Sequence, residues 1–157
     1  MHEVLAQAEP SCAEYLEGVW TEARIEAAAV DFCTLFILPK GVSPMASAWC
    51  PKGADAESVS IGIQQLVRSL SEQVQIPLPV GMQEIPAEHA GLLLYLGGSL
   101  AAADDATLRD QACSFLQEAT VPWLEQFATR LSEHPASPLY RAVGVILSQS
   151  YKQSIKP

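Results

Sequence analysis

Positive charge is scarce in this chain of 157 residues. Nine lysines and arginines stand against eighteen aspartates and glutamates, which gives a formal net charge of −9. So few cations argue against non-specific binding to nucleic acid, because that binding depends on neutralising phosphates. The scarcity of cations also argues against binding to an anionic membrane surface. The acidic surface would instead attract a basic partner and speed its arrival.

The common sequence signatures of catalysis are also missing. The chain has no Gly-x-Gly-x-x-Gly turn after a strand, no phosphate-binding Gly-x-x-x-x-Gly-Lys-Ser/Thr loop and no Gly-x-Ser-x-Gly elbow. Cys113 could in principle act as a nucleophile with His89 or His134 as its base, but nothing in the neighbouring sequence supports this pairing. We therefore expect no enzymatic activity, no catalytic residue and no cofactor.

The cysteines do not form a metal-binding pattern. Cys12, Cys33, Cys50 and Cys113 include no Cys-x-x-Cys pair, and no histidine lies at zinc-ligand spacing from any of them. The sequence therefore predicts no metal site. It favours four reduced and mostly buried thiols in a cytosolic protein.

Long hydrophobic runs are absent as well. Residues 1–10 carry two glutamates and no apolar run, so they do not resemble a signal peptide. The longest apolar stretch, residues 90–103, is interrupted by Gly97, Gly98 and Ser99 and is shorter than the ~20 residues of a membrane span. We expect a cytoplasmic protein without membrane insertion.

What the chain does have is helical periodicity. Hydrophobic residues make up 49% and charged residues 17%, which is a globular composition. Apolar residues recur at steps of three and four, and no segment alternates with period two. We predict one all-α domain over 1–157, a single compact bundle of about six helices with a long Pro-rich loop. The first half of the chain is expected to hold a helix over 11–38 broken near Gly18, the loop 39–54, a helix capped by Asp55 and a connector over 76–86. Four further helices are expected after it. They start at Pro86, after a cap at Asp104 or Asp105, at Pro122 (ending at Leu131), and at Ser137–Pro138.

Two carboxylates and an imidazole gather before the most apolar of these helices. Glu84, Glu88 and His89 flank Pro86 there. Acids at a helix N-terminus complement its dipole, and the histidine could be a satisfied core residue. Alternatively, the cluster is a recognition site, in which acidic acceptors beside an apolar wall suit guanidinium groups next to a hydrophobic segment. That wall could be supplied by residues whose default assignment is the core, namely Leu92, Leu93 and Leu96.

The Pro-rich loop contributes two further candidates. Ser47 and Trp49 lie in it, and we expect them to face the Glu84–His89 cluster. Trp49 either fills a gap between helices or offers a rigid flat surface with one hydrogen-bond donor. A later segment, Thr120–Leu124 with Phe127, is better explained by helix initiation and core packing.

Five segments in register resemble the TorD/DmsD-type chaperones. They are Glu26–Pro39, Pro44–Trp49, Glu84–His89, Val121–Phe127 and Leu139–Arg141. The resemblance as a whole covers roughly residues 23–150. They are similar, in order, to the family's helix before its Pro-rich loop, its Pro-aromatic-x-Ser-x-aromatic loop, its Glu-x-Pro-Asp-His signature, its Pro-Trp-Leu-x-x-Phe element and its late Tyr-Arg element. Three positions depart from these patterns: Met45 replaces a loop aromatic, Glu88 replaces the signature aspartate, and Ala87 is an extra residue before it.

The resemblance implies a cytoplasmic chaperone for a molybdenum-containing respiratory oxidoreductase. Such chaperones bind the precursor's twin-arginine leader peptide and delay export until the cofactor is inserted. On this interpretation the peptide-binding residues are Ser47, Trp49, Glu84, Pro86, Glu88 and His89. An acidic protein suits a basic leader, and an apolar helical groove suits the leader's hydrophobic stretch.

Other functions and assemblies stay open at this point. The chain could be a chaperone of the nitrate-reductase type that grips the enzyme body, a small guanine-nucleotide hydrolase, or a generic acidic helical adaptor. The enzyme that it serves could act on dimethyl sulfoxide, trimethylamine oxide, formate, polysulfide or tetrathionate. The protein could be a monomer or a domain-swapped dimer.

Overall fold

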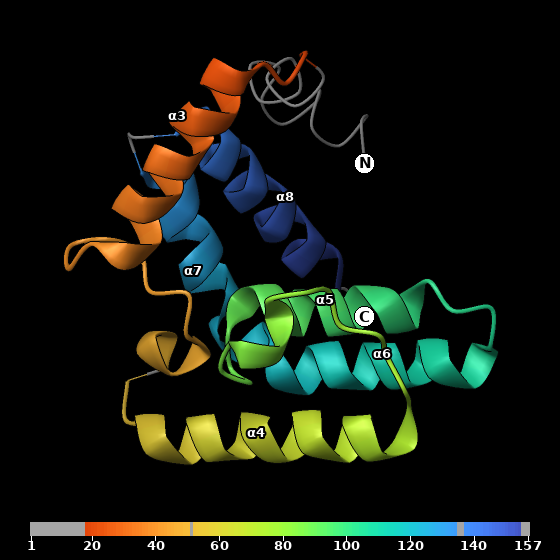
Figure 1. Cartoon of the computed structure of the whole chain (residues 1–157). Coiled ribbons are helices and arrows are strands. Elements are labelled where there is room, and N and C mark those ends of the chain that lie inside the picture. Colours follow the sequence, from red (N-terminus) through yellow and green to blue (C-terminus); the bar gives the residue numbers. More distant parts are fainter. Residues whose placement is uncertain (1–17, 51, 135–136, 155–157) are drawn as a thin grey trace. The chain divides into compact units, whose positions relative to one another are not determined.

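A computed structural model describes residues 18–50, 52–134 and 137–154 of the chain (Figure 1). These ranges contain six α-helices and no β-strand, so the predicted all-α class is confirmed. The chain divides into two compact units, residues 44–123 and the remainder. The single domain expected over 1–157 stays a prediction.

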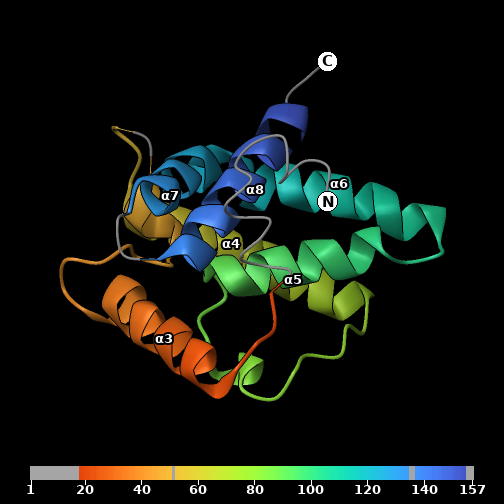
Figure 2. The ribbon, with the colours of Figure 1, turned by 90° about the horizontal axis from the view of Figure 1, so that it is seen from above.

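The unit of residues 44–123 is centred on a helical hairpin. Helices α5 (Ala90–Ala101) and α6 (Ala106–Ala119) run side by side in Figures 1 and 2. Gly97 permits their close approach, because a Cβ atom there would overlap Leu116. As predicted, α5 is buried on most sides, and its core residues include Leu92, Leu93 and Leu96. The remaining elements of this unit are the 3-10 helix η2 (Ala46–Trp49), α4 (Ala56–Gln73), the 3-10 helix η3 (Met82–Glu84) and the first turn of α7 (Val121–Glu133).

Side-chain caps fix where the helices of this unit begin. Asp55 accepts hydrogen bonds from the Ser58 amide (2.9 Å) and hydroxyl (2.6 Å), which confirms it as the N-cap of α4. Of the two aspartates proposed for α6, the structure selects Asp105, which accepts from the Thr107 amide at 2.7 Å.

The prediction that a helix starts at Pro86 was wrong. Helix α5 starts four residues later, at Ala90, and its N-cap is His89. The backbone of His89 forms an isolated antiparallel bridge with Met45, and extended backbone at the bridge is incompatible with an earlier helical turn. Glu88 therefore precedes the helix rather than lying in its first turn.

The other unit contains α3 (Glu22–Phe32), the greater part of α7, and α8 (Pro138–Ser154). Helices α7 and α8 pack backbone to backbone at Gly144, where a Cβ would lie 2.6 Å from the Ser132 nitrogen and 2.7 Å from the Ala128 oxygen. The predicted Ser137–Pro138 start of α8 is confirmed. Only a glycine lets the two helices approach this closely.

A π-helix that the sequence did not predict continues α3. It spans Cys33–Ile37, and the Leu38 amide donates to the Cys33 carbonyl at 3.1 Å, which is the i→i+5 pattern. Pro39 disfavours helical backbone at Leu38, whose ψ is 148°, so the helix stops there. The chain then turns back, and the Val42 amide donates to the Leu35 carbonyl at 2.5 Å.

Tyr140 of the late Tyr-Arg element packs beside this π-helix. Its ring meets the Phe36 ring edge-on, with centroids 5.1 Å apart. Burial, together with the nearby Asp31 and Cys33, raises the pKa of the Tyr140 hydroxyl above its ordinary value. The segment that resembles the family's late Tyr-Arg element therefore contributes a packing contact, through the Tyr140 ring.

The expectation of mostly buried thiols was wrong. Cys33 and Cys113 are exposed and Cys50 is half-buried, and none of these three is in a disulfide. Cys12 lies outside the described residues. Each of the two exposed cysteines occupies a helical position that faces outward, although a thiol is itself an apolar group.

Exposed thiols contribute little packing energy, so their removal is expected to be mild. Replacing Cys33, Cys50 and Cys113 with serine should change the free energy of unfolding by about 0.5 kcal/mol or less per site. At Cys50 the serine hydroxyl can keep the hydrogen bond that the thiol donates to the Ser47 carbonyl at 3.0 Å. Urea titration of the triple variant checks this, and a loss of several kcal/mol would contradict it.

Candidate functional site

A backbone bridge joins the Pro-rich loop to the segment before α5. The Ala46 amide donates to the Glu88 carbonyl at 3.1 Å, and the Ala90 amide donates to the Pro44 carbonyl at 2.8 Å. These two bonds flank the Met45–His89 bridge. The Pro-rich loop and the segment before α5 therefore lie side by side in one unit.

Glu88 is the central side chain of this junction. One carboxylate oxygen accepts from the Ser47 amide and the other from the Ser60 hydroxyl, both at 2.9 Å. Partial burial alone would raise the pKa of the Glu88 carboxyl, but the hydrogen bonds from Ser47 and Ser60 outweigh it and hold that pKa below its ordinary value. The carboxylate thereby ties η2, α4 and the start of α5 together.

His89 has a defined structural role. Its Nδ1 atom accepts from the Gly91 amide at 3.0 Å, which caps the first turn of α5. A nitrogen that accepts carries no proton, so the ring is neutral with its proton on Nε2. Burial lowers the pKa of His89, in agreement with this state.

The remaining predicted site residues lie on or near the surface of the same unit. Glu84 and Pro86 are exposed, with Glu84 at the end of η3. Trp49 is half-buried at the end of η2. The structure thus brings Ser47 and Glu88 into direct contact, gives His89 a capping role, and leaves the Glu84 carboxylate accessible to solvent.

Sequence reasoning missed Ser60. It lies on α4, 28 positions before Glu88, and supplies one of the two hydrogen bonds to that carboxylate. A serine inside an amphipathic helix gives no local signal of such a contact. The pairing follows from how α4 packs against η2, which periodicity does not encode.

Metal-binding and membrane-spanning features are both lacking in residues 18–50, 52–134 and 137–154. These ranges contain no cluster of three or more His, Cys, Asp or Glu side chains placed to hold a metal ion. Within the same residues, no helix has both the length and the apolar character that a membrane crossing requires.

The sequence comparison identifies the family. Residues 1–129 match the family described as nitrate reductase delta subunit, so the chain belongs to that family. This is the TorD/NarJ-like family of redox-enzyme maturation chaperones, which confirms the resemblance drawn from the five segments. Its function is the maturation of molybdoenzymes such as nitrate reductase. Neither the curated proteins nor the solved structures gave a match to the chain.

The protonation states of Glu88 and His89 predict a stability that falls on acidification. Both groups have a lower pKa in the folded chain than the ordinary values of 4.5 and 6.5. Below those values the unfolded chain therefore binds more protons than the folded one. The His89 contribution is complete above about pH 6.5 and is lost as pH falls through its folded pKa. The Glu88 contribution is lost in the same way below about pH 4.5.

Urea titrations between pH 4 and 8 measure this dependence. His89→Asn is the matched variant, because asparagine is a good N-cap but does not titrate. The variant should lose part of the slope that begins below about pH 6.5 and keep the part that begins below about pH 4.5. An unchanged slope over both intervals would contradict the assigned state of His89.

Proposed function

We propose that the chain binds the twin-arginine leader of a molybdenum-containing oxidoreductase precursor in the cytoplasm and holds it back until the cofactor is inserted. The family match over residues 1–129 carries the role in molybdoenzyme maturation. The net charge of −9 supports the basic leader as the segment that is bound. In this proposal the protein is a binding partner of the precursor and not a catalyst.

The charge balance supports a basic ligand. The net charge of −9 favours association with a leader that carries arginines. Four residues before Glu88 in the sequence, the exposed Glu84 carboxylate is available to a guanidinium group, whereas the Glu88 carboxylate already accepts two hydrogen bonds. We therefore assign first contact with the arginines to Glu84, with Ser47, Trp49, Pro86, Glu88 and His89 as the surrounding surface.

Leader binding should weaken with salt. Between about 50 and 500 mM NaCl, a synthetic twin-arginine leader should lose affinity several-fold, mainly through slower association. Replacing both arginines with glutamine should weaken binding further. Surface plasmon resonance gives both rates, and affinity that is indifferent to salt and to the arginine pair would contradict the proposal.

The substitution Glu84→Gln tests whether Glu84 contacts the leader arginines, by the same binding measurement. It should weaken leader binding about two- to fivefold, as expected for one exposed charge pair. Glu133→Gln is the matched control, since it removes the same charge from an exposed position near the end of α7. Equal effects of the two substitutions would indicate that only net charge matters.

The family match favours one alternative: the protein grips the body of the enzyme rather than its leader. The matched family is described as nitrate reductase delta subunit. Pull-down of a precursor with and without its leader separates the two functions. Loss of capture on leader deletion supports leader binding, and unchanged capture supports binding to the enzyme body.

A further inference from the structure

Exposed apolar side chains are concentrated in one segment, which includes α3 and the π-helix. Nine large hydrophobic residues are exposed in the part of the chain that the structure describes, and seven of them lie between positions 19 and 38. These seven are Val19, Trp20, Ile25, Val30, Phe32, Ile37 and Leu38. Single exposed hydrophobic residues are normal on a protein surface, whereas a group of this size indicates an interaction surface.

Helix α3 presents part of this group as a stripe. No residue of this helix is buried, and its inner side carries the half-buried Ala28 and Asp31. Ile25, Ala29 and Phe32 are exposed and follow one another at steps of four and three, so they share one outward face of the helix. These three residues are called the α3 face below.

The shape of the α3 face suits a second helix. Ala29 is small and lies at its centre, between the larger Ile25 and Phe32, so another helix can approach closely there. The Phe32 ring packs against the Phe36 ring with centroids 5.2 Å apart, yet 43% of Phe32 stays exposed. A ring that is already held in place loses less entropy when a partner covers it.

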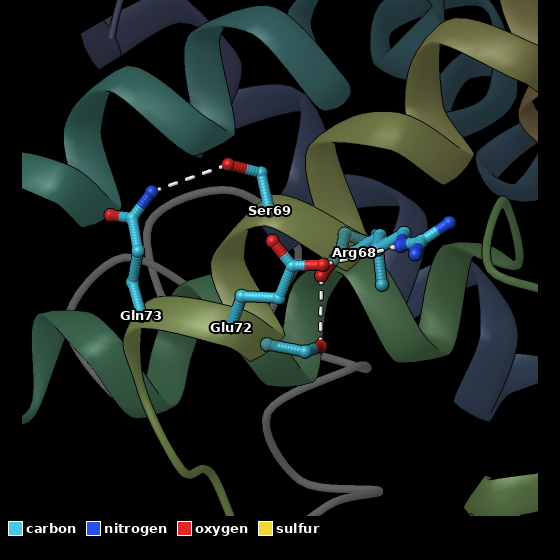
Figure 3. Close-up of polar contacts among 6 residues, drawn as sticks. Arg68, Ser69, Glu72 and Gln73 are labelled. Atoms are coloured by element: carbon cyan, nitrogen blue, oxygen red, sulfur yellow. Dashed lines mark hydrogen bonds and ion pairs between the residues drawn. The ribbon is translucent and has the colours of Figure 1, made fainter.

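The charged side chains around α3 have no ion-pair partner within the described residues. On α4, by contrast, Arg68 pairs with Glu72 of the same helix at 3.2 Å (Figure 3). Glu22 and Glu26 of α3 and Lys40 after the π-helix are exposed, and none of them makes an ion pair with a residue in 18–50, 52–134 or 137–154. These three charges are therefore available to a second molecule.

The sign of these charges changes along α3. Glu22 and Glu26 lie near its start, and Lys40 lies beyond its end. When two such helices lie antiparallel, the acidic start of each meets the basic end of the other. A purely cationic partner would be attracted by the glutamates and repelled by Lys40. The charge pattern therefore favours a second copy of this chain over a basic peptide.

We propose that two copies of the chain form a symmetric dimer through the α3 face, with the two α3 helices antiparallel. Around a two-fold axis at Ala29, residues equally far before and after that position oppose each other. Ile25 of each copy then packs beside Phe32 of the other, and Glu22 of each approaches the end that carries Lys40. None of these residues is assigned to leader binding, so the inference stands apart from the proposed function.

Sedimentation velocity tests the apolar part of the contact. The wild type should show a monomer–dimer equilibrium with a dissociation constant in the micromolar range, on the order of 1–100 μM. Ile25→Gln should raise that constant about tenfold or more, because the dimer contains this residue twice. Ile61→Gln is the matched control: Ile61 lies on α4 and is 47% exposed, compared with 55% for Ile25. It should leave the dissociation constant unchanged.

Charge reversal tests the antiparallel arrangement. Lys40→Glu should weaken the dimer about three- to tenfold, because two attractive pairs become repulsive. Adding Glu22→Lys to that variant should restore the wild-type constant, since each new lysine then meets a new glutamate. A parallel arrangement would give no such rescue. Circular dichroism confirms that every variant keeps its helices.

A wild-type protein that stays monomeric up to several hundred μM would overturn the proposal. So would a dimer that Ile25→Gln leaves intact, as expected of one formed by domain swapping, or a failure of Glu22→Lys to rescue Lys40→Glu. If the protein is monomeric and Ile25→Gln abolishes capture of the precursor, then the α3 face binds the precursor and the dimer is again excluded.

Discussion

Replacing Gly144 with alanine is expected to lower the free energy of unfolding by about 2–3 kcal/mol, the upper part of the range for overpacked sites. The added Cβ would lie 2.6 Å from the Ser132 nitrogen and 2.7 Å from the Ala128 oxygen. Both atoms belong to the backbone of α7, so no side chain can rotate away to make room. The two helices would have to separate, and their interface would lose packing along its length.

Gly98→Ala is the control for this substitution. It also places alanine inside a helix, but its Cβ meets nothing within 4 Å. The control should stabilise the chain by about 0.5–1 kcal/mol, because alanine loses less backbone entropy than glycine. Equal effects in urea titrations would show that the contact at Gly144 does not limit the approach of α8 to α7.

Removing the Glu88 side chain should cost about 1–3 kcal/mol. Glu88→Ala leaves the Ser47 amide and the Ser60 hydroxyl without their shared acceptor. Glu88→Gln should cost somewhat less, since its amide oxygen can accept one of the two bonds while its NH2 group faces the other donor. Thermal unfolding and urea titration of both variants measure these losses.

A double-mutant cycle that combines Glu88→Ala with Ser60→Ala measures the coupling energy between these two side chains. The two substitutions should be strongly non-additive, because each removes the same hydrogen bond. Leader affinity is measured on the same variants. If Glu88→Gln keeps full stability and loses leader affinity about five- to a hundredfold, then Glu88 is an acceptor for a leader arginine and not a structural clamp.

The helices themselves were predictable because their signals are local. Asp55 and the Ser137–Pro138 pair marked the starts of α4 and α8 correctly, since caps and N-terminal prolines act within one turn. The near-continuous apolar run identified α5 as the core helix. All of these features are encoded within a few residues of where they act.

The predictions that were wrong concern features that depend on contacts between residues far apart in the sequence. The start of α5 shifted from Pro86 to Ala90 because Met45, far away in the sequence, pairs with His89. The role of Ser60 was not predicted because its hydrogen-bond partner, Glu88, lies on another element. The exposure of Cys33 and Cys113 depends on which face of each helix turns inward, and that face is set by the elements packed against the helix.

The Met45–His89 bridge has a consequence for the order of folding. Helices α5 and α6 are joined by a short connection and can pair early, because closing a short loop costs little entropy. The bridge instead joins residues separated by the whole of α4 and its connector, so it must close a much longer segment. Contacts of such long range raise contact order and slow folding. The Glu88 junction is therefore expected to form late, after the α5–α6 hairpin is in place.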